Sequence, residues 1–295
     1  MKQTSKKRRL RSLIAGLLLL LLALWCLWGN GALMASRITV CDPRLPEAFH
    51  GYRIVHLSDL HNARFGEDHT NLVRLIEAEQ PSIIVMTGDM IDSRQPHVEL
   101  TLALAEKLTA LAPVYYVTGN HEARIPETAE RLIEGLRERG VRVLRGETVE
   151  LTQGGASIGL TGVDDLGVYY RDAQTIDGAK AALSEALAAL VKEDGYTILL
   201  SHRPELVDLY AESGACLALC GHAHGGQIRL PGVGGLFAPG QGVFPTYDAG
   251  LYEESGMVMV VSRGLGNSTF PLRINNRPEI VTVQLMCRAR DDNGD

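Results

Sequence analysis

The fold of this chain is decided by residues 52–61, which read YRIVHLSDLH. The run Tyr52–Leu57 predicts a buried strand, because short apolar segments rich in β-branched residues are typical of sheet interiors. Asp59 and His61 follow directly, and residues two apart on an extended chain point to the same side. Ligands of open α/β sheets bind just beyond the carboxyl ends of the strands. The stretch therefore predicts a ligand site at the edge of a sheet.

The same arrangement recurs at four later places, where an apolar strand ends in polar donors. The predicted strands are 83–86, 114–117, 197–200 and 217–220, and the fragments after them read TGDMID, TGNHE, SHRP and GHAHG. Each fragment alone is weak, since a Gly-Asp pair is commonly a turn and a single histidine is commonly a loop residue. Together, the five strand ends predict one shared site built from Asp59, His61, Asp89, Asn120, His202, His222 and His224.

The donor set indicates the chemistry of this site. Carboxylate, amide and imidazole groups without thiolate suit Mn²⁺, Fe²⁺ or Zn²⁺ better than Ca²⁺. Seven protein donors are too many for one open catalytic ion and fit two divalent ions that share a bridging ligand. Two such ions, about 3.5–4 Å apart, activate a bridging water and screen the charge of an attacked phosphate. The sequence therefore predicts a two-metal phosphoester hydrolase.

Helix-patterned stretches alternate with the strands, and this alternation predicts an α/β sandwich. Helices are expected at 71–79, 98–111, 128–139 and 173–192. Further strands are expected at 141–144, 148–151, 157–162, 227–230, 257–262 and 280–285.

The N-terminal region predicts a membrane anchor. Residues 1–11 carry six basic residues and no acidic one, and Leu13–Trp28 contains no charge. A helix continued to Ala35 is about 34 Å long at about 1.5 Å per residue, enough to cross a hydrocarbon core of about 30 Å. A cleavable signal peptide is the alternative. The predicted organisation is a basic cytoplasmic tail at 1–11, a transmembrane anchor at 12–35, a linker at 36–50, a catalytic body at 51–288 and an acidic tail at 289–295.

Charge bears on location and partners. Basic residues before the anchor place the N-terminus in the cytoplasm and the body outside the plasma membrane, as a single-pass protein. Without the six basic residues of the tail, 23 basic residues face 35 acidic ones, which argues against broad nucleic-acid binding. A monomer is expected. The five cysteines include no Cys-x-x-Cys pair, which excludes a zinc ribbon, and a Cys41–Cys287 pairing stays open.

As a set, the five fragments resemble the calcineurin-like metallophosphoesterase superfamily, whose pattern Asp-x-His, Gly-Asp-x-x-Asp, Gly-Asn-His-Glu, His and Gly-His-x-His is matched here in order. The resemblance implies that 51–288 forms a metallophosphoesterase-type β-sandwich of mixed sheets flanked by helices. It also implies residue roles. Asp59, His61 and His224 would hold one metal, Asn120, His202 and His222 the other, and Asp89 would bridge them. A metal-bridging hydroxide would attack phosphorus, His121 would protonate the leaving oxygen, and Asp92 would hold its ring.

Two residues of this pattern keep a second interpretation. Asp92 is equally well explained as a helix N-cap before Arg94. Glu122 is better explained as a second-layer or helix-start acid than as a metal ligand.

A narrower resemblance covers more of the chain. The fragments SHRPE (201–205), GHAHGGQIRLP (221–231), FAPG (237–240), SRGLGNS (262–268) and RPE (277–279) are similar to bacterial membrane-associated phosphodiesterases of the YkuE and YaeI type. Some relatives of this branch are assigned UDP-2,3-diacylglucosamine pyrophosphohydrolase activity in lipid A synthesis. Such a substrate lies at the cytoplasmic side, whereas the charge pattern places this body outside, so one of these two inferences must yield.

The leading hypothesis is a phosphodiesterase or phosphatase at the membrane surface that acts on a lipid-linked or cell-envelope phosphoester. The alternatives are the lipid A pyrophosphohydrolase, a nuclease, and an anchored metal-binding adaptor without turnover. No substrate-binding residue is assigned. The loop 231–250 with Arg229, Arg263 and Arg273 either shapes a substrate pocket or forms a solvated surface.

Overall fold

The computed structural model describes residues 2–192, 195–267 and 270–287. Strands of one mixed sheet lie in the order β1-β16-β2-β3-β4-β5. Their bounds are Met34–Cys41 (β1), Glu279–Met286 (β16), Arg53–Leu57 (β2), Ile83–Thr87 (β3), Val114–Val117 (β4) and Arg142–Val143 (β5). All neighbours in this sheet are parallel except β16 and β2, which are antiparallel. Parallel β2, β3 and β4 therefore end at the same edge.

The second sheet has the order β14-β15-β9-β8-β7-β6. Its strands are Gly250–Glu254 (β14), Met257–Val261 (β15), Leu217–Cys220 (β9), Thr197–Leu200 (β8), Ala156–Gly162 (β7) and Glu147–Gln153 (β6). Antiparallel pairs, β14/β15 and β6/β7, form its two edges, and its interior pairs are parallel. Because β8 and β9 are parallel, their carboxyl ends also lie at one edge of this second sheet.

Helices cover the outer faces of both sheets. The first sheet packs against α2 (Thr70–Ala78), α3 (Val98–Thr109) and α5 (Pro126–Glu138), and the second against α7 (Ile176–Leu190) and α8 (Val207–Glu212), with α6 (Leu166–Ala173) beside α7. Alternation along β3 shows how the layers are made: Ile83 and Val85 face the other sheet, while Ile84 and Met86 face the helices. This arrangement confirms the predicted sandwich of mixed sheets flanked by helices.

Short elements complete the chain. They are α4 (Asn120–Arg124), the 3₁₀ turns η1 (Glu47–Phe49), η2 (Glu67–His69), η3 (Pro204–Leu206) and η4 (His224–Gly226), and two small hairpins made by β10 (Arg229–Leu230) with β11 (Gly234–Gly235) and β12 (Phe237–Ala238) with β13 (Gly242–Val243). The strand expected at 227–230 is shorter than predicted, because Gln227 has a φ of 61°.

In two segments the structure differs in detail from the sequence prediction. The helix expected at 173–192 forms as α7, and α6, which was not predicted, lies before it. The two helices are separated at Gln174, which has a φ of 60°. Thr175 then caps α7 by accepting the N–H of Gly178. Of the linker expected at 36–50, residues 36–41 belong to β1. β1 pairs in parallel with β16 over its whole length, so this part of the segment belongs to the sheet.

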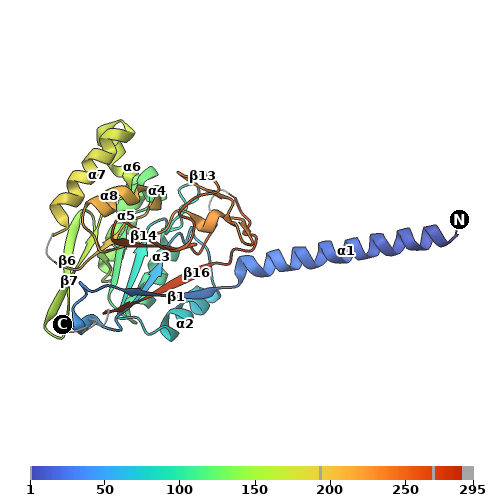
Figure 1. Ribbon diagram of the computed structural model, residues 1–295, viewed down its shortest axis with the longest axis horizontal. Coiled ribbons are helices and arrows are strands. Elements are labelled where there is room, and N and C mark those ends of the chain that lie inside the picture. The colour runs from blue at the N-terminus through green and yellow to red at the C-terminus, as the bar shows by residue number, and fades with distance from the viewer. Residues whose placement is uncertain (1, 193–194, 268–269, 288–295) are drawn as a thin grey trace, which may run out of the picture.

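Helix α1 (Lys2–Gly31) projects alone from the body (Figure 1). Its 22 residues Leu10–Gly31 are long and apolar enough to cross a membrane and bury nothing inside the protein. The helix ends four residues before the predicted limit of the anchor at 35, and only Ala32 and Leu33 separate it from β1. The acidic tail expected at 289–295 lies outside the described residues. All five cysteines are free, so Cys41 and Cys287 are not paired.

Candidate metal centre

The seven candidate ligands lie together where the carboxyl ends of strands from both sheets meet. Asp59 and His61 follow β2, Asp89 follows β3, Asn120 begins α4 after β4, His202 follows β8, and His222 and His224 follow β9. All seven side chains are buried. Hydrogen bonds join the two sheets at this point: His202 donates through Nδ1 to the carbonyl oxygen of Thr87 at 2.7 Å, and the backbone N–H of His222 donates to Asp59 Oδ2 at 3.0 Å.

One group of donors surrounds His61 and His224. Their Nε2 atoms lie 3.2 Å apart, and Asp59 Oδ1 lies 3.9 Å from the first and 3.4 Å from the second. Ligands at about 2.1 Å from a tetrahedral ion lie about 3.4 Å from one another. Asp59, His61 and His224 therefore fit one metal ion.

A second group surrounds Nε2 of His202. This nitrogen lies 3.2 Å from Asn120 Oδ1, 3.2 Å from His222 Nδ1 and 3.3 Å from Asp89 Oδ2. Because the Nδ1 proton of His202 is donated to Thr87, the neutral ring presents a lone pair at Nε2. The four donors fit a second ion, and the fixed tautomer is the kind of outer contact that orients a metal-binding histidine.

Asp89 lies between the two groups. Its Oδ2 is 3.5 Å from Nε2 of His61 in the first group and 3.3 Å from Nε2 of His202 in the second. Its Oδ1 accepts the backbone N–H of His121 at 2.7 Å. The carboxylate is thus positioned to contact both ions.

The electrostatics of the cluster favour bound cations. Burial lowers the pKa of His61 and of His224 to about 3, so both rings are neutral and able to ligate. Burial also lowers the pKa of His202, but Asp89 and Asp59 outweigh it and raise that pKa to about 10. A proton therefore occupies the centre of the second group in the metal-free protein. A divalent cation would take its place between the same carboxylates.

The backbone around the donors is held in an uncommon conformation. Asp59, His61, Asp89, His222 and His224 all have φ between 44° and 64°. Such residues cost on the order of 1 kcal/mol or more each and persist where the surrounding structure enforces them, often at functional sites. Gly119 shows how tightly the loops pack, because a Cβ there would overlap the Asp89 backbone nitrogen and carboxylate.

Glu122 connects the loop after β3 to the loop after β4 through hydrogen bonds. Its Oε2 accepts the N–H groups of Asp89 and Gly119, each at 2.8 Å, and its Oε1 accepts the N–H of Ile91 at 3.2 Å. The side chain is fully buried, and burial together with Asp89 raises its pKa to about 7. Glu122 is therefore a support for Asp89, in agreement with its interpretation as a second-layer acid.

His121 lies at the rim of the cluster, with Nε2 4.0 Å from Asp89 Oδ2. Its Nδ1 accepts the backbone N–H of Ser93 at 2.9 Å, so the proton of the neutral ring is on Nε2. Asp92 Oδ1 lies 3.7 Å from Nδ1, and the Asp92 carboxylate accepts the backbone N–H of Arg94 at 2.9 Å and its guanidinium. Asp92 thus makes the turn contact with Arg94 and also lies beside His121, but the helix that it would have capped does not form there.

The family of the chain follows from comparison with known proteins. The model of the calcineurin-like phosphoesterase family matches residues 52–226, a range that includes all seven donors and more than half of the chain. This chain belongs to the calcineurin-like phosphoesterase family. It is accordingly a metal-dependent phosphoester hydrolase.

Relatives of this phosphoesterase include both bacterial and vertebrate proteins. The uncharacterized metallophosphoesterase YkuE of Bacillus subtilis is 32% identical over 254 residues, covering 84% of this chain and 83% of that protein. The phosphodiesterase YaeI of Escherichia coli is 27% identical, covering 80% of this chain and 82% of that protein. A transmembrane protein with metallophosphoesterase domain of Danio rerio is 32% identical, covering 82% of this chain but 55% of that protein.

Sequence reasoning about this phosphoesterase missed Glu205. Its Oε1 lies 3.6 Å from Nε2 of His222 and from Nη1 of Arg203. Arg203 in turn donates two hydrogen bonds to Asp165. The sequence signals were the position of Glu205 three residues after His202 and its place in the fragment SHRPE (201–205), but neither indicated its role.

The arginines proposed as pocket residues have other partners. Arg273 is buried and donates to Asn267 Oδ1 and to the carbonyl oxygens of Arg263 and Gly266. Arg229 pairs with Asp248 at 2.9 Å. Arg273 is therefore a structural cation.

Proposed function

We propose that this phosphoesterase is a dinuclear hydrolase acting at a membrane surface. Asp59, His61 and His224 would hold one ion, Asn120, His202 and His222 the other, and Asp89 would bridge them. The observation that carries the proposal is the position of Asp89 Oδ2, within 3.5 Å of a histidine from each group. Two divalent ions would neutralise phosphate charge and lower the pKa of a water between them.

His121 is proposed as the acid that protonates the leaving oxygen. Acceptance of the Ser93 N–H at Nδ1 leaves the ring proton on Nε2, which faces the rim of the cluster. A positioned imidazole proton donor typically contributes about 10²–10⁴-fold to a rate. The Ser93 N–H would keep the neutral ring in this orientation. The charge of Asp92, with Oδ1 3.7 Å from Nδ1, would favour the protonated ring and hold it in place once both nitrogens carry protons.

The proposed metals are Mn²⁺, Fe²⁺ or Zn²⁺, because the donors are imidazole, carboxylate and amide groups. The proposed location is the outer face of the plasma membrane, with the basic N-terminus of α1 in the cytoplasm. A lipid-linked or cell-envelope phosphoester is then the substrate class within reach of an anchored site. Protease accessibility of the body in intact cells tests this topology.

The function is tested with the purified full chain in lipid nanodiscs. We expect two metal ions per chain by mass spectrometry, and hydrolysis of bis-p-nitrophenyl phosphate that is lost on chelation and restored by Mn²⁺. Asp89→Asn is expected to lower kcat by at least about 10²–10³-fold, as for other removed electrostatic contacts, and to lower the metal content. Asp42→Asn is the matched control, because Asp42 is also buried but pairs with Arg44. An Asp89→Asn protein as active as wild type would refute the proposal.

A further inference from the structure

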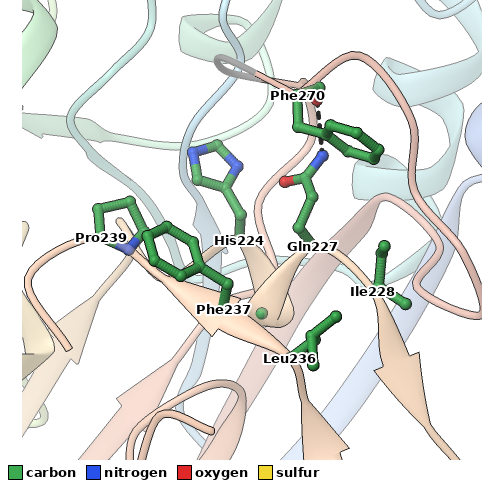
Figure 2. A pocket seen from close by; sticks show the side chains of 8 residues that line it. His224, Gln227, Ile228, Leu236, Phe237, Pro239 and Phe270 are labelled. Carbon is green, nitrogen blue, oxygen red and sulfur yellow. Dashed lines mark hydrogen bonds between the residues drawn. The ribbon is translucent and has the colours of Figure 1, made fainter. Parts of the chain in front are cut away.

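An apolar cavity of about 310 Å³ adjoins the metal centre, and His224 forms part of its wall. Figure 2 shows the apolar side chains around it, which are Ile228, Leu236, Phe237, Pro239 and Phe270. The polar group beside them, the Gln227 amide, is already engaged, since Nε2 donates to the carbonyl oxygens of Phe270 at 2.8 Å and Leu272 at 3.2 Å. The cavity therefore offers hydrocarbon contact and few polar partners.

Exposed apolar side chains are concentrated on the segments that line this cavity. Outside α1, the described residues include nine exposed large hydrophobic side chains, and six of them belong to the two small hairpins or to the facing loop: Leu230, Val233, Phe237, Val243, Phe244 and Phe270. Two of the six, Phe237 and Phe270, line the cavity itself. Exposed apolar side chains gathered in this way are typical of a surface that contacts a protein, a ligand or a membrane.

The membrane anchor is attached to the same region. Asn30, at the end of α1, donates to the carbonyl oxygen of Arg273 at 2.9 Å and accepts its N–H at 2.8 Å. Arg273 lies three residues after Phe270, and Ile274 forms a β-bridge with Ile228 of the cavity wall. The point where the chain enters the bilayer is thus joined to the loop that lines the cavity, on the side of the body from which α1 projects (Figure 1).

We propose that this cavity is a subsite for the hydrocarbon chain of a phosphoester lipid, which approaches from the bilayer while its phosphate lies at the metal centre. The inference rests on the proposed function, because it assigns the substrate class of the same site. Because the candidate metal ligand His224 forms part of the cavity wall, a hydrocarbon chain in the cavity would lie next to the scissile phosphate. A volume of about 310 Å³ is at the lower end of the range of about 300–1,000 Å³ for small-molecule sites, enough for part of one chain.

The test compares p-nitrophenyl phosphodiesters whose second alcohol is methyl, butyl or octyl, with the full chain in nanodiscs. Each buried methylene is worth up to about fourfold in affinity, so we expect kcat/KM to rise at least tenfold from methyl to octyl. In Leu236→Gln and Phe237→Ser the ratio of kcat/KM for the octyl ester to kcat/KM for the methyl ester should fall below threefold. Phe237 is half exposed, so its replacement carries little risk to folding.

Val243→Ser is the matched control. Val243 is exposed and is the β-sheet partner of Phe237, but it does not line the cavity. In this variant, kcat/KM should still rise from the methyl to the octyl ester as in wild type. Because the octyl ester partitions into the bilayer equally with both proteins, the comparison corrects for that partition.

A binding measurement separates the subsite from the proposed function. Methylphosphonate and octylphosphonate are titrated calorimetrically into the same nanodiscs, and tighter binding of the octyl compound to wild type than to Leu236→Gln supports the subsite even if no ester is hydrolysed. Hydrolysis of all three esters at equal kcat/KM would overturn the subsite and leave the hydrolase standing. Loss of a dimer in Phe237→Ser, with unchanged chain-length dependence, would assign the apolar face to a second copy of the chain and also overturn it.

Discussion

Glu122 offers a quantitative test of how the metal centre is supported. Its carboxylate accepts three buried backbone N–H groups, from Asp89, Gly119 and Ile91. Glu122→Ala would leave all three without this acceptor, and at about 1–3 kcal/mol for each unsatisfied group we expect a loss of roughly 3–9 kcal/mol in the free energy of unfolding. The loops that carry Asp89 and Asn120 would then separate.

Glu122→Gln should be milder, because its single oxygen can still accept the two N–H groups that share Oε2. Only the Ile91 N–H would then face the amide NH₂, so the expected loss is about 1–3 kcal/mol. Burial already disfavours the ionised carboxylate, with its pKa raised to about 7, so the neutral amide regains part of this loss.

The assay is urea unfolding of the metal-free full chain in detergent, followed by pulse proteolysis of the body. Glu134→Gln and Glu134→Ala are the controls, because Glu134 is exposed on α5, and both should stay within about 0.5 kcal/mol of wild type. If Glu122→Ala is no less stable than Glu122→Gln, the three hydrogen bonds do not hold the loops together.

Three further results are expected. Glu205→Gln should weaken the binding of one metal ion by about 10–100-fold, as for other groups that contact metal-binding histidines. Calorimetric titration of the metal-free protein with Mn²⁺ would measure the affinity. An unchanged affinity would show that the 3.6 Å contact between Glu205 and His222 has no such role. Arg37→Met should destabilise the protein at pH 7 and progressively less as the pH falls below 4.5. The Arg37 hydrogen bond lowers the pKa of Glu79 from its ordinary value of 4.5, so this stabilisation is present above that pH and is lost as the pH falls through the pKa of the folded state. Urea midpoints of the variant and wild type from pH 7 downwards measure the difference, and a difference that does not shrink would contradict the pairing. Arg273→Met removes the donor to three oxygen acceptors, of which the Gly266 carbonyl is buried and the other two are part-buried. The free energy of unfolding should fall by on the order of 3–5 kcal/mol, whereas a change below about 1 kcal/mol would argue against its structural role.

The strands that carry the donors could be predicted from sequence because they are short, apolar and buried on both faces. β8 and β9 occupy the predicted residues 197–200 and 217–220, and β4 occupies 114–117. Buried parallel strands read as continuous apolar runs, and their ends are marked by the first polar residue. All seven donors lie within four residues of these strand ends, so finding the strands also located the cluster.

β1 could not be predicted in the same way. Its residues Met34–Cys41 alternate and are mostly half exposed at the sheet edge, and its partner β16 lies more than 200 residues away in the chain. Nothing local marks such pairing, because the hydrogen bonds of an edge strand are supplied entirely by a distant segment. The segment therefore looked like a linker.

The contacts of Glu205 and Arg273 could not be predicted from the sequence either. A lone glutamate after a Pro gives no sign that folding will place it 3.6 Å from a candidate ligand. A Gly-rich neighbourhood made Arg273 resemble a phosphate-binding arginine, yet its guanidinium is enclosed by backbone carbonyl groups. Burial of a charged side chain depends on the acceptors that the fold brings to it, and these come from loops whose conformation has no periodic pattern.

Helix α1 and the candidate metal centre are connected more directly than the sequence suggests. In the structure, Asn30 is hydrogen-bonded to the backbone of Arg273, Arg273 donates to the carbonyl oxygen of Gly266, and the N–H of Gly266 donates to the carbonyl oxygen of Asp59. A continuous chain of hydrogen bonds thus links the end of α1 to a candidate ligand. Because only residues 32–33 separate α1 from β1, the body has little freedom to rotate about α1. With α1 in a membrane, as proposed above, these contacts would set the height and orientation of the site above the bilayer.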